Sequence, residues 1–392
     1  STTLLTHDEI MARVDALTPL LKDNAQRTEE DRVVAPVVID AMRDAGLFRL
    51  FVPRRFGGYE LGFRTAVEAV STISQTCSGS GWVLMVFTGH DWLMGMFPEQ
   101  GQADVYRDGP DALLAGGLAS QGFAEPVDGG WRVSGRWQFG SGCDYATWCI
   151  AGALVTTSDP DRPKHVHVVV PRSDFTIDDT WYTLGLRGSG SKDVLLKDVF
   201  VPARRSIATG ALFRGEGDAA LHQDINLYRL PVTAGLAIQA AAVVLGITRS
   251  ALDLFVEQTK TATHKYTGES KAEKVGIQMR IAEAAAEIRS AGLLIDDVLT
   301  EFEQLVATGA NPDLDFRVRT KWETVYAIQI CRRALDRLYA AAGARAIFDT
   351  SPLQQAFRDI NTAAHHATVD FDGAAEIYGR VALGLKPGSV LI

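Results

Sequence analysis

The sequence predicts a mainly α-helical protein with a central β domain, because its pattern changes twice along 392 residues. Residues 1–112 carry apolar side chains at the three-to-four-residue spacing of amphipathic helices. Residues 113–210 hold short runs of β-branched and aromatic residues between turn residues, which is typical of strands. From 220 to 392 long helical patterns return with short links, as in a four-helix bundle. We therefore expect three domains in that order.

The N-terminal domain shows clear helix starts and stops. Thr6 with Glu9 three residues later is a capping box, and apolar residues follow it at helical spacing. A second helix is expected from Pro36 to Asp44, with Gly46 as its stop. Further helices should extend through Val70 and then cross residues 81–97.

The central domain should be a small antiparallel, barrel-like sheet. Turn residues such as Asp128-Gly129-Gly130 separate its candidate strands. These strands are expected at residues 113–120, 131–139, 147–155, 165–171 and 193–202.

Four long helices are expected in the C-terminal domain, at residues 231–259, 270–307, 313–343 and 352–383. The apolar stretch from Leu230 to Ile247 is about as long as a membrane span. It contains Thr233 and Gln239 and is rich in Ala and Gly, which favours a buried bundle helix instead.

Composition excludes several classes of function. The net charge is −9, whereas a general nucleic-acid binder is usually basic. The four cysteines lie far apart without zinc spacing, so reduced thiols and no metal site are expected. The adjacent His365 and His366 would point about 100° apart on a helix, which also argues against metal. Without a basic, apolar leader at the start, we expect a cytoplasmic protein that does not enter a membrane.

Three motifs follow one another along the chain. They are Trp137-Gln138-Phe139-Gly140-Ser141-Gly142-Cys143-Asp144, the segment at residues 185–194, and Arg358-Asp359 followed by His366. Their order resembles the acyl-CoA dehydrogenase superfamily and, within it, the flavin monooxygenase branch, the oxygenase components of two-component (group D) enzymes. The resemblance spans essentially the whole chain and implies the three-domain fold already expected.

One position separates the two chemistries within that superfamily. Many dehydrogenases place a Glu, the base that removes an α-proton, nine residues after the Arg of the Arg-Asp pair. Here that residue is Ala367, and His366 precedes it. A His is the side chain that holds or donates a proton near neutral pH. The resemblance implies that His366 lies beside the flavin. The alternatives are His365 in that role, or a histidine pair that takes no part in the chemistry.

The resemblance implies further site residues. Ser141 is expected to donate a hydrogen bond to flavin N5 or O4, and Ser120 to lie at the flavin or substrate edge, so both join His366 as catalytic candidates. Alternatives are a turn serine for Ser141, a core aromatic for Trp137 and a glycine-requiring turn at Arg187 and Ser189. The other expected flavin contacts are Trp137, Arg187, Ser189 and Gly343. The expected substrate contacts are His90, Trp92 and Phe87, for which core packing is the alternative.

The resemblance also implies a function. A separate NAD(P)H-dependent reductase would supply reduced FAD or FMN, oxygen would form a C4a-hydroperoxyflavin, and a phenolic or indolic substrate would be hydroxylated. The chain contains no nicotinamide fingerprint, which agrees with an external electron source. A homotetramer is implied. Open alternatives are N- or S-oxygenation, an acyl-CoA dehydrogenase or oxidase with a displaced base, and a non-catalytic flavin-binding relative.

Overall fold

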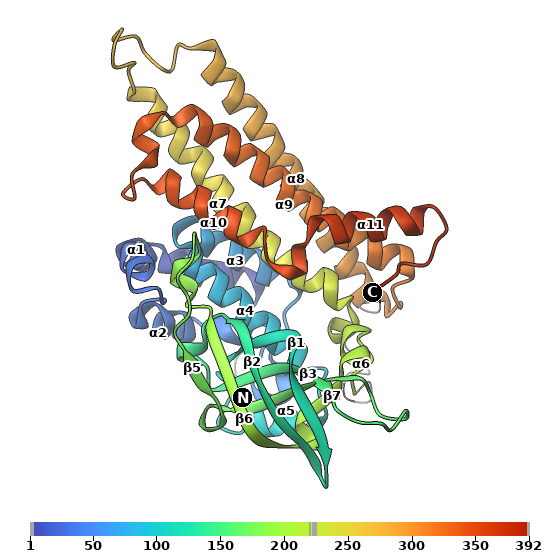
Figure 1. The fold of residues 1–392 in the computed structure, drawn as a ribbon. Coiled ribbons are helices and arrows are strands. Elements are labelled where there is room, and N and C mark those ends of the chain that lie inside the picture. The colour runs from blue at the N-terminus through green and yellow to red at the C-terminus, as the bar shows by residue number, and fades with distance from the viewer. Residues whose placement is uncertain (1–3, 219–220, 222–225, 390–392) are drawn as a thin grey trace.

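The computed structural model describes residues 4–218, 221 and 226–389. Its helices and seven-stranded sheet follow the predicted order along the chain (Figure 1). The predicted start of the last domain, residue 220, lies outside the described residues. The predicted domain boundaries stay predictions.

The N-terminal domain consists of helices, as the sequence predicted. The capping box at Thr6 is confirmed, since its hydroxyl accepts from the Glu9 N–H and Glu9 accepts from the Thr6 N–H. Gly46 follows α2 in the left-handed conformation that ends a helix. The helices are α1 (His7–Asp31), α2 (Pro36–Asp44), α3 (Phe63–Thr76), α4 (Ser78–Met94) and α5 (Glu99–Val105).

The sheet differs from the antiparallel barrel that the sequence predicted. Its strand order is β5-β6-β2-β1-β3-β4-β7, so the two outer strands do not pair and the sheet stays open. β1 also runs parallel to β3, because the chain crosses between them through β2. The strands are β1 (Leu114–Val127), β2 (Gly130–Gly140), β3 (Trp148–Val155), β4 (His165–Pro171), β5 (Thr176–Asp178), β6 (Lys192–Pro202) and β7 (Ser206–Ala208).

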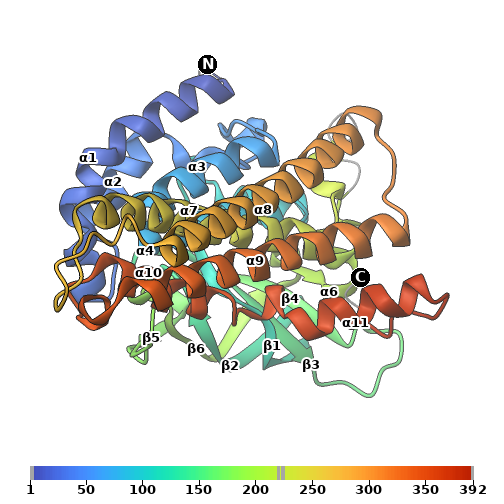
Figure 2. The same ribbon diagram turned by 90° about the horizontal axis from the view of Figure 1, so that it is seen from above.

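The C-terminal domain contains three long helices and two short ones, above the sheet in Figure 1 and across it in Figure 2. They are α7 (Val232–Thr261), α8 (Val275–Thr308), α9 (Leu314–Ala342), α10 (Pro352–Ala363) and α11 (Phe371–Ala382), after the short α6 (Thr209–Phe213). The predicted single helix at 352–383 is wrong, since residues 364–370 interrupt it. There His366 caps a 3-10 turn, Ala367–Val369, and Asp370 caps α11.

The apolar stretch of membrane length lies in α7. By length and composition this helix passes a test for a membrane span, but 89% of its apolar window is buried inside the protein. Packing also requires small residues there, since a side chain on Gly246 would collide with the Ser71 carbonyl of α3. α7 is therefore a core helix of the fold.

α4 connects the three domains. It packs against α3, against α7 of the bundle, against β1 and against the 3-10 turn Arg187–Ser189. Its side chains are buried on nearly every face. Polar residues on this helix therefore lie between the sheet and the bundle, where the candidate site is found.

Candidate flavin site

Ser141 stands in a tight turn at the end of β2. The preceding Phe139 and the following Gly142 both have positive φ, 65° and 72°. A side chain at Gly142 would come within 2.7 Å of the Phe87 ring in α4, so only glycine fits there. The turn holds Ser141 with 4% of its surface exposed, facing α4.

Ser141 belongs to a buried row of hydroxyl groups. Its Oγ lies 2.6 Å from the Ser191 Oγ, which lies 2.7 Å from the Ser189 Oγ. Ser189 donates to the Leu186 carbonyl at 2.7 Å. The sequence predicted Ser141 and Ser189 as site residues separately, and the structure connects them through Ser191.

Trp82 of α4 connects the serine row to the bundle. Its indole N–H donates to the Ser141 Oγ at 3.1 Å, and its ring meets the His366 ring edge to face, with centroids 5.4 Å apart. Trp82 was not predicted as a site residue, because an aromatic residue in an apolar helix gives no sign of which loop it faces. Trp82 thus brings Ser141 and His366 into one cluster.

The hydrogen bonds of His366 determine its tautomer. The Thr368 backbone N–H donates to the His366 Nδ1 at 3.3 Å, so Nδ1 is an acceptor and carries no proton. The Thr368 hydroxyl also lies 2.8 Å from Nδ1. The pKa of His366 is lowered to about 4 by burial and by the charge of Lys321, so the ring is neutral at pH 7. Its proton is therefore on Nε2, which has no partner among the described residues and is free to donate.

Lys321 of α9 lies behind His366 and was also missed from the sequence. Its ammonium group donates to the Thr368 carbonyl, which orders the turn that holds His366, and to the Thr233 carbonyl at 3.4 Å. Burial lowers the pKa of Lys321 to about 8, partly opposed by Asp370. A lysine in an amphipathic helix is normally solvated, so the sequence gave no indication that Lys321 is a site residue.

We predict that the charge of Lys321 adds to the effect of burial in keeping His366 neutral. In Lys321→Met, the pKa of His366 should rise from about 4 toward its ordinary value, because a nearby cation disfavours imidazolium. Besides Lys321, the only titratable group that contributes to this shift is His90, itself neutral at pH 7. NMR titration of the His366 ring would measure the change, with Lys321→Arg as the charge-preserving control. An unchanged pKa in the Met variant would refute the electrostatic link.

His90 presents the opposite polarity to His366. Its Nδ1 lies 2.8 Å from the Leu114 carbonyl, which can only accept, so Nδ1 carries the proton. Burial lowers the pKa of His90 to about 4, and the ring stays neutral. Its Nε2 is therefore an acceptor without a partner in the described part of the chain. A charge on His90 would contribute to lowering the pKa of His366, so the two histidines lie within electrostatic range of each other.

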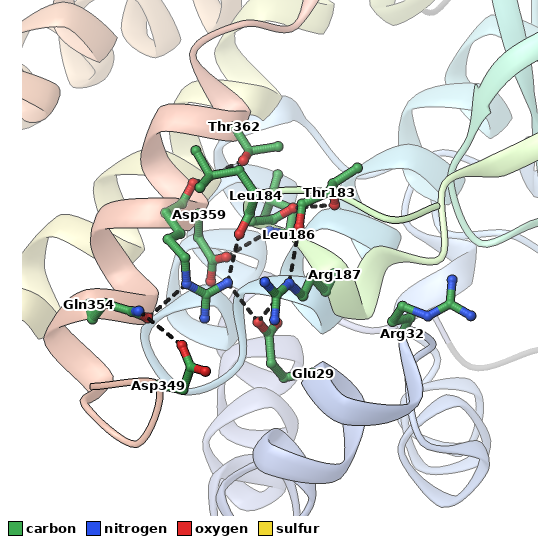
Figure 3. A network of polar contacts seen from close by, with 12 residues as sticks. Glu29, Arg32, Thr183, Leu184, Leu186, Arg187, Asp349, Gln354, Asp359 and Thr362 are labelled. Carbon is green, nitrogen blue, oxygen red and sulfur yellow. Dashed lines mark hydrogen bonds and ion pairs between the residues drawn. The ribbon is translucent and has the colours of Figure 1, made fainter. Parts of the chain in front are cut away.

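A network of charged residues fixes α10 against the other two domains (Figure 3). Arg358 donates to Glu29 of α1 at 2.9 Å and to the Leu184 carbonyl at 2.7 Å. Arg187 contacts the same Glu29 oxygen at 3.8 Å and donates to the Thr183 carbonyl. Arg187 therefore supports the loop before the serine row and is not free to serve as an isolated flavin ligand.

Asp359 holds the same loop from the other side. Its two oxygens accept from the Ser78 hydroxyl at 2.5 Å and from the Leu186 N–H at 2.6 Å. Burial raises the pKa of Asp359 to about 6. Because a side chain on Gly185 would collide with the Arg358 carbonyl, the loop and α10 are in backbone contact. The Arg-Asp pair thus positions the site through its surroundings.

Three aromatic residues predicted at the site are core residues instead. Trp137 is fully buried beneath Gly117, Gly122 and Gly135, with its N–H on the Gly152 carbonyl. Trp92 is fully buried against Phe63, with its N–H on the Leu227 carbonyl. Phe87 packs against Phe48 beneath the Ser141 turn. None of the three has surface left for a ligand, so these predictions are corrected to packing.

Three further predicted residues lie outside the cluster. Ser120 is exposed on β1 and lies 2.9 Å from His165 Nδ1. Gly343 ends α9 beside Lys271, separated from His366 by the 12 residues of α10, a rise of about 18 Å. His365 is exposed and its Nδ1 donates to the Asn361 carbonyl. Of the two adjacent histidines, the structure brings only His366 to Trp82 and Ser141.

The cluster fits the polar edge of a reduced flavin. That edge has an N–H at N5, and the neighbouring carbon is the atom that reacts with oxygen. The Ser141 oxygen suits the N–H, and the free Nε2–H of His366 suits an oxygen atom beside it. Both groups are already held by hydrogen bonds, Ser141 by Ser191 and Trp82 and His366 by Thr368, so binding would not require them to be reordered.

The chain matches two families along its length. Residues 8–104 match "Acyl-CoA dehydrogenase, N-terminal domain" and residues 238–371 match "Acyl-CoA dehydrogenase, C-terminal domain". These matches and the three-domain architecture define an acyl-CoA dehydrogenase fold.

Relatives with named activities narrow the class. The chain is 34% identical to "Pigment production hydroxylase" of Rhodococcus sp., over 99% of this chain and 100% of the relative. It is 33% identical to "FADH(2)-dependent resorcinol hydroxylase, oxygenase component" of Rhizobium sp., over 97% and 95% of the two chains. The structure of XiaF from Streptomyces sp. with FADH2 has a TM-score of 0.91 at 29% identity, covering 98% and 97%.

The chain therefore belongs to the acyl-CoA dehydrogenase superfamily and, within it, to the oxygenase components of two-component flavin-dependent monooxygenases. It is an enzyme that uses reduced flavin made by a separate reductase. The resemblance stated from the sequence is confirmed.

Proposed function

We propose that this enzyme hydroxylates a small phenolic or indolic compound, using reduced flavin and oxygen. The observation that carries the proposal is the opposed polarity of two neutral histidines, an Nε2–H donor on His366 and an Nε2 acceptor on His90. His366 can donate a hydrogen bond to the oxygen to be transferred. His90 can accept one from the hydroxyl or ring N–H of a substrate. The named activity of the resorcinol hydroxylase supports this class of substrate.

Reduced flavin, when bound, supplies two electrons and takes up oxygen, of which one atom enters the substrate. In the overall reaction an aromatic C–H becomes C–OH, the second oxygen atom leaves as water, and the flavin is oxidised. In this proposal Ser141 orients the flavin edge and His366 donates a hydrogen bond to the oxygen. Trp82, which is only 4% exposed between Ser141 and His366, excludes water together with the bundle helices. FADH2 is the proposed first choice of flavin.

His90 is proposed to orient the substrate. A phenol O–H or an indole N–H is a donor, and the His90 Nε2, which has no partner among the described residues, is an acceptor. An amine oxide or sulfoxide precursor need not present such a donor, so this polarity favours carbon hydroxylation over N- or S-oxygenation. Asp359 cannot be the free carboxylate base that an acyl-CoA dehydrogenase would need, because both of its oxygens are occupied by donors.

We predict that His90→Leu raises the KM for a phenol by roughly tenfold, the effect of about one hydrogen bond in a buried site. Binding of reduced flavin should change little, since His90 bonds the substrate side. Steady-state kinetics on resorcinol and flavin titration would measure the two effects. An equal loss of flavin and phenol binding would contradict the assignment, and His90→Gln, which can retain an acceptor, should lose less.

The proposal is tested by reconstitution. The purified protein, an NADH-dependent flavin reductase and oxygen would be supplied with phenols, indoles, thioethers, amines and acyl-CoA thioesters in turn. Hydroxylation of a phenol or indole supports the proposal. Reaction with only the thioethers, amines or acyl-CoA thioesters would overturn it.

We further propose a cytoplasmic homotetramer assembled through α8 and α9. Val275, Met279 and Leu293 of α8 expose apolar side chains, from 58 to 67% of their surface. Leu293 also lines a hollow of about 660 Å³ between α8 and α9 together with Tyr326 and Ile330. Such patches mark interfaces.

Leu293→Arg should therefore dissociate the tetramer, because it introduces a charge into the proposed interface. Leu383→Arg, at an exposed leucine beyond α11, should not. Light scattering after size exclusion would measure both. A monomeric wild-type protein would contradict the proposal.

A further inference from the structure

Three serines form a linear row of hydrogen bonds between the sheet and α4. Ser141, Ser189 and Ser191 are 4, 1 and 3% exposed. The Gly142 N–H donates to the Ser189 carbonyl at 3.0 Å, which joins the Ser141 turn to the 3-10 turn carrying Ser189. The row is therefore built into the backbone of two turns.

Each serine has one hydrogen, and this fixes the direction of the row. The hydrogen of Ser189 goes to the Leu186 carbonyl, which can only accept. Ser191 must then be the donor to Ser189, and Ser141 the donor to Ser191. The Trp82 N–H enters the row from the other end, at the Ser141 oxygen. All the hydrogens therefore point from Trp82 toward Leu186.

This direction leaves Ser141 as an acceptor only. Its hydrogen is used by Ser191 and one lone pair is used by Trp82, so one lone pair remains. From the sequence, Ser141 was expected to donate to the flavin, and the hydrogen-bond directions oppose that expectation. A donation to the flavin would require breaking the bond to Ser191 in a buried place, which is costly.

We propose that the Ser141–Ser191–Ser189 row makes the site select reduced flavin over oxidised flavin. The proposal rests on the proposed function, in which Ser141 meets the flavin N5. Reduced flavin carries a hydrogen on N5 and donates it, whereas the N5 of oxidised flavin has a lone pair and accepts. An acceptor-only Ser141 therefore bonds the reduced form and faces the oxidised form lone pair to lone pair.

Such selection suits an enzyme that must capture reduced flavin from a reductase and release it after oxidation. Ser191 and Ser189 touch no flavin in this arrangement. They are positioning residues that act by consuming the Ser141 hydrogen. Removing the Ser191 hydroxyl frees that hydrogen, and Ser141 can then turn it toward the N5 of oxidised flavin.

The test is the ratio of the dissociation constants for oxidised and reduced flavin, measured by anaerobic and aerobic titration of the whole protein. Wild type should bind reduced flavin more tightly. In Ser191→Ala the ratio should fall about tenfold, the effect of one net hydrogen bond, mainly through tighter binding of oxidised flavin. Ser191→Thr retains the hydroxyl and should retain the ratio.

Ser189→Ala provides a second, independent variant. Without Ser189 the Ser191 hydrogen loses its acceptor and can turn back to Ser141, so the ratio should fall again. Folding of Ser191→Ala and Ser189→Ala would be checked by circular dichroism. A folded variant of either kind with an unchanged ratio would overturn the inference. If wild type binds neither form of flavin, the proposed function itself fails, which is a different outcome.

Discussion

His366→Ala should lower the rate of hydroxylation about a hundredfold, while the oxidation of bound reduced flavin continues. Removing one hydrogen-bond donor aimed at developing charge in a buried site costs roughly 10²–10³ in rate. The neutral Nε2–H of His366 is such a donor, held by Thr368 and by the packing of Trp82. The electrons should then appear as hydrogen peroxide instead of product.

The neighbouring histidine gives a matched control. His365 is exposed and bonded to its own helix, so His365→Ala should leave product and peroxide yields unchanged. Product would be measured by chromatography and peroxide by a coupled peroxidase. Equal effects of the two substitutions would show that the assignment of His366 is wrong.

Arg358→Ala should destabilise the protein by about 3 kcal/mol or more. Its guanidinium side chain is 9% exposed and pairs with Glu29, which is 15% exposed. Removing Arg358 leaves the Glu29 carboxylate with only the more distant and more exposed Arg187, and the loss of one partner from a buried ion pair typically costs about 3–5 kcal/mol. The Leu184 carbonyl would also lose its donor. Urea unfolding would measure the change in free energy.

Arg187→Ala is the control, because Arg187 contacts the same carboxylate oxygen but is 39% exposed. An exposed pair contributes about 0–1 kcal/mol, so this variant should unfold close to wild type. A loss in Arg358→Ala no larger than that in Arg187→Ala would contradict the role given to the network.

The order of helical, β and helical regions could be predicted from the sequence, because side-chain periodicity reports on local structure. The four strands predicted from residue 131 onward agree with the structure to within one residue, whereas the short β5 and β7 were not predicted. The parallel pairing of β1 with β3 could not be predicted, since it depends on which strands meet in space. The break at residues 364–370 has no Pro or Gly to signal it.

The site was predictable only where a motif carries it. Ser141 and His366 stand in recognisable segments, and the structure brings them together. Trp82 and Lys321 stand in no motif, and Ser191 stands in the 185–194 motif without having been predicted as a site residue, so only tertiary packing shows that they are neighbours. Trp137, Trp92 and Phe87 were misassigned, because the sequence cannot distinguish an aromatic residue that lines a site from one that packs beneath it. Core packing was the stated alternative for all three residues, and the structure shows core packing.

The most direct test of the account is a single turnover with isotopically labelled oxygen. The protein would be mixed anaerobically with FADH2 and a phenol on which it is active, then exposed to ¹⁸O₂. The account predicts one ¹⁸O atom in the hydroxylated ring, with a yield near one product per flavin that falls in His366→Ala. A product without ¹⁸O, or flavin oxidation that yields only hydrogen peroxide in wild type, would contradict it.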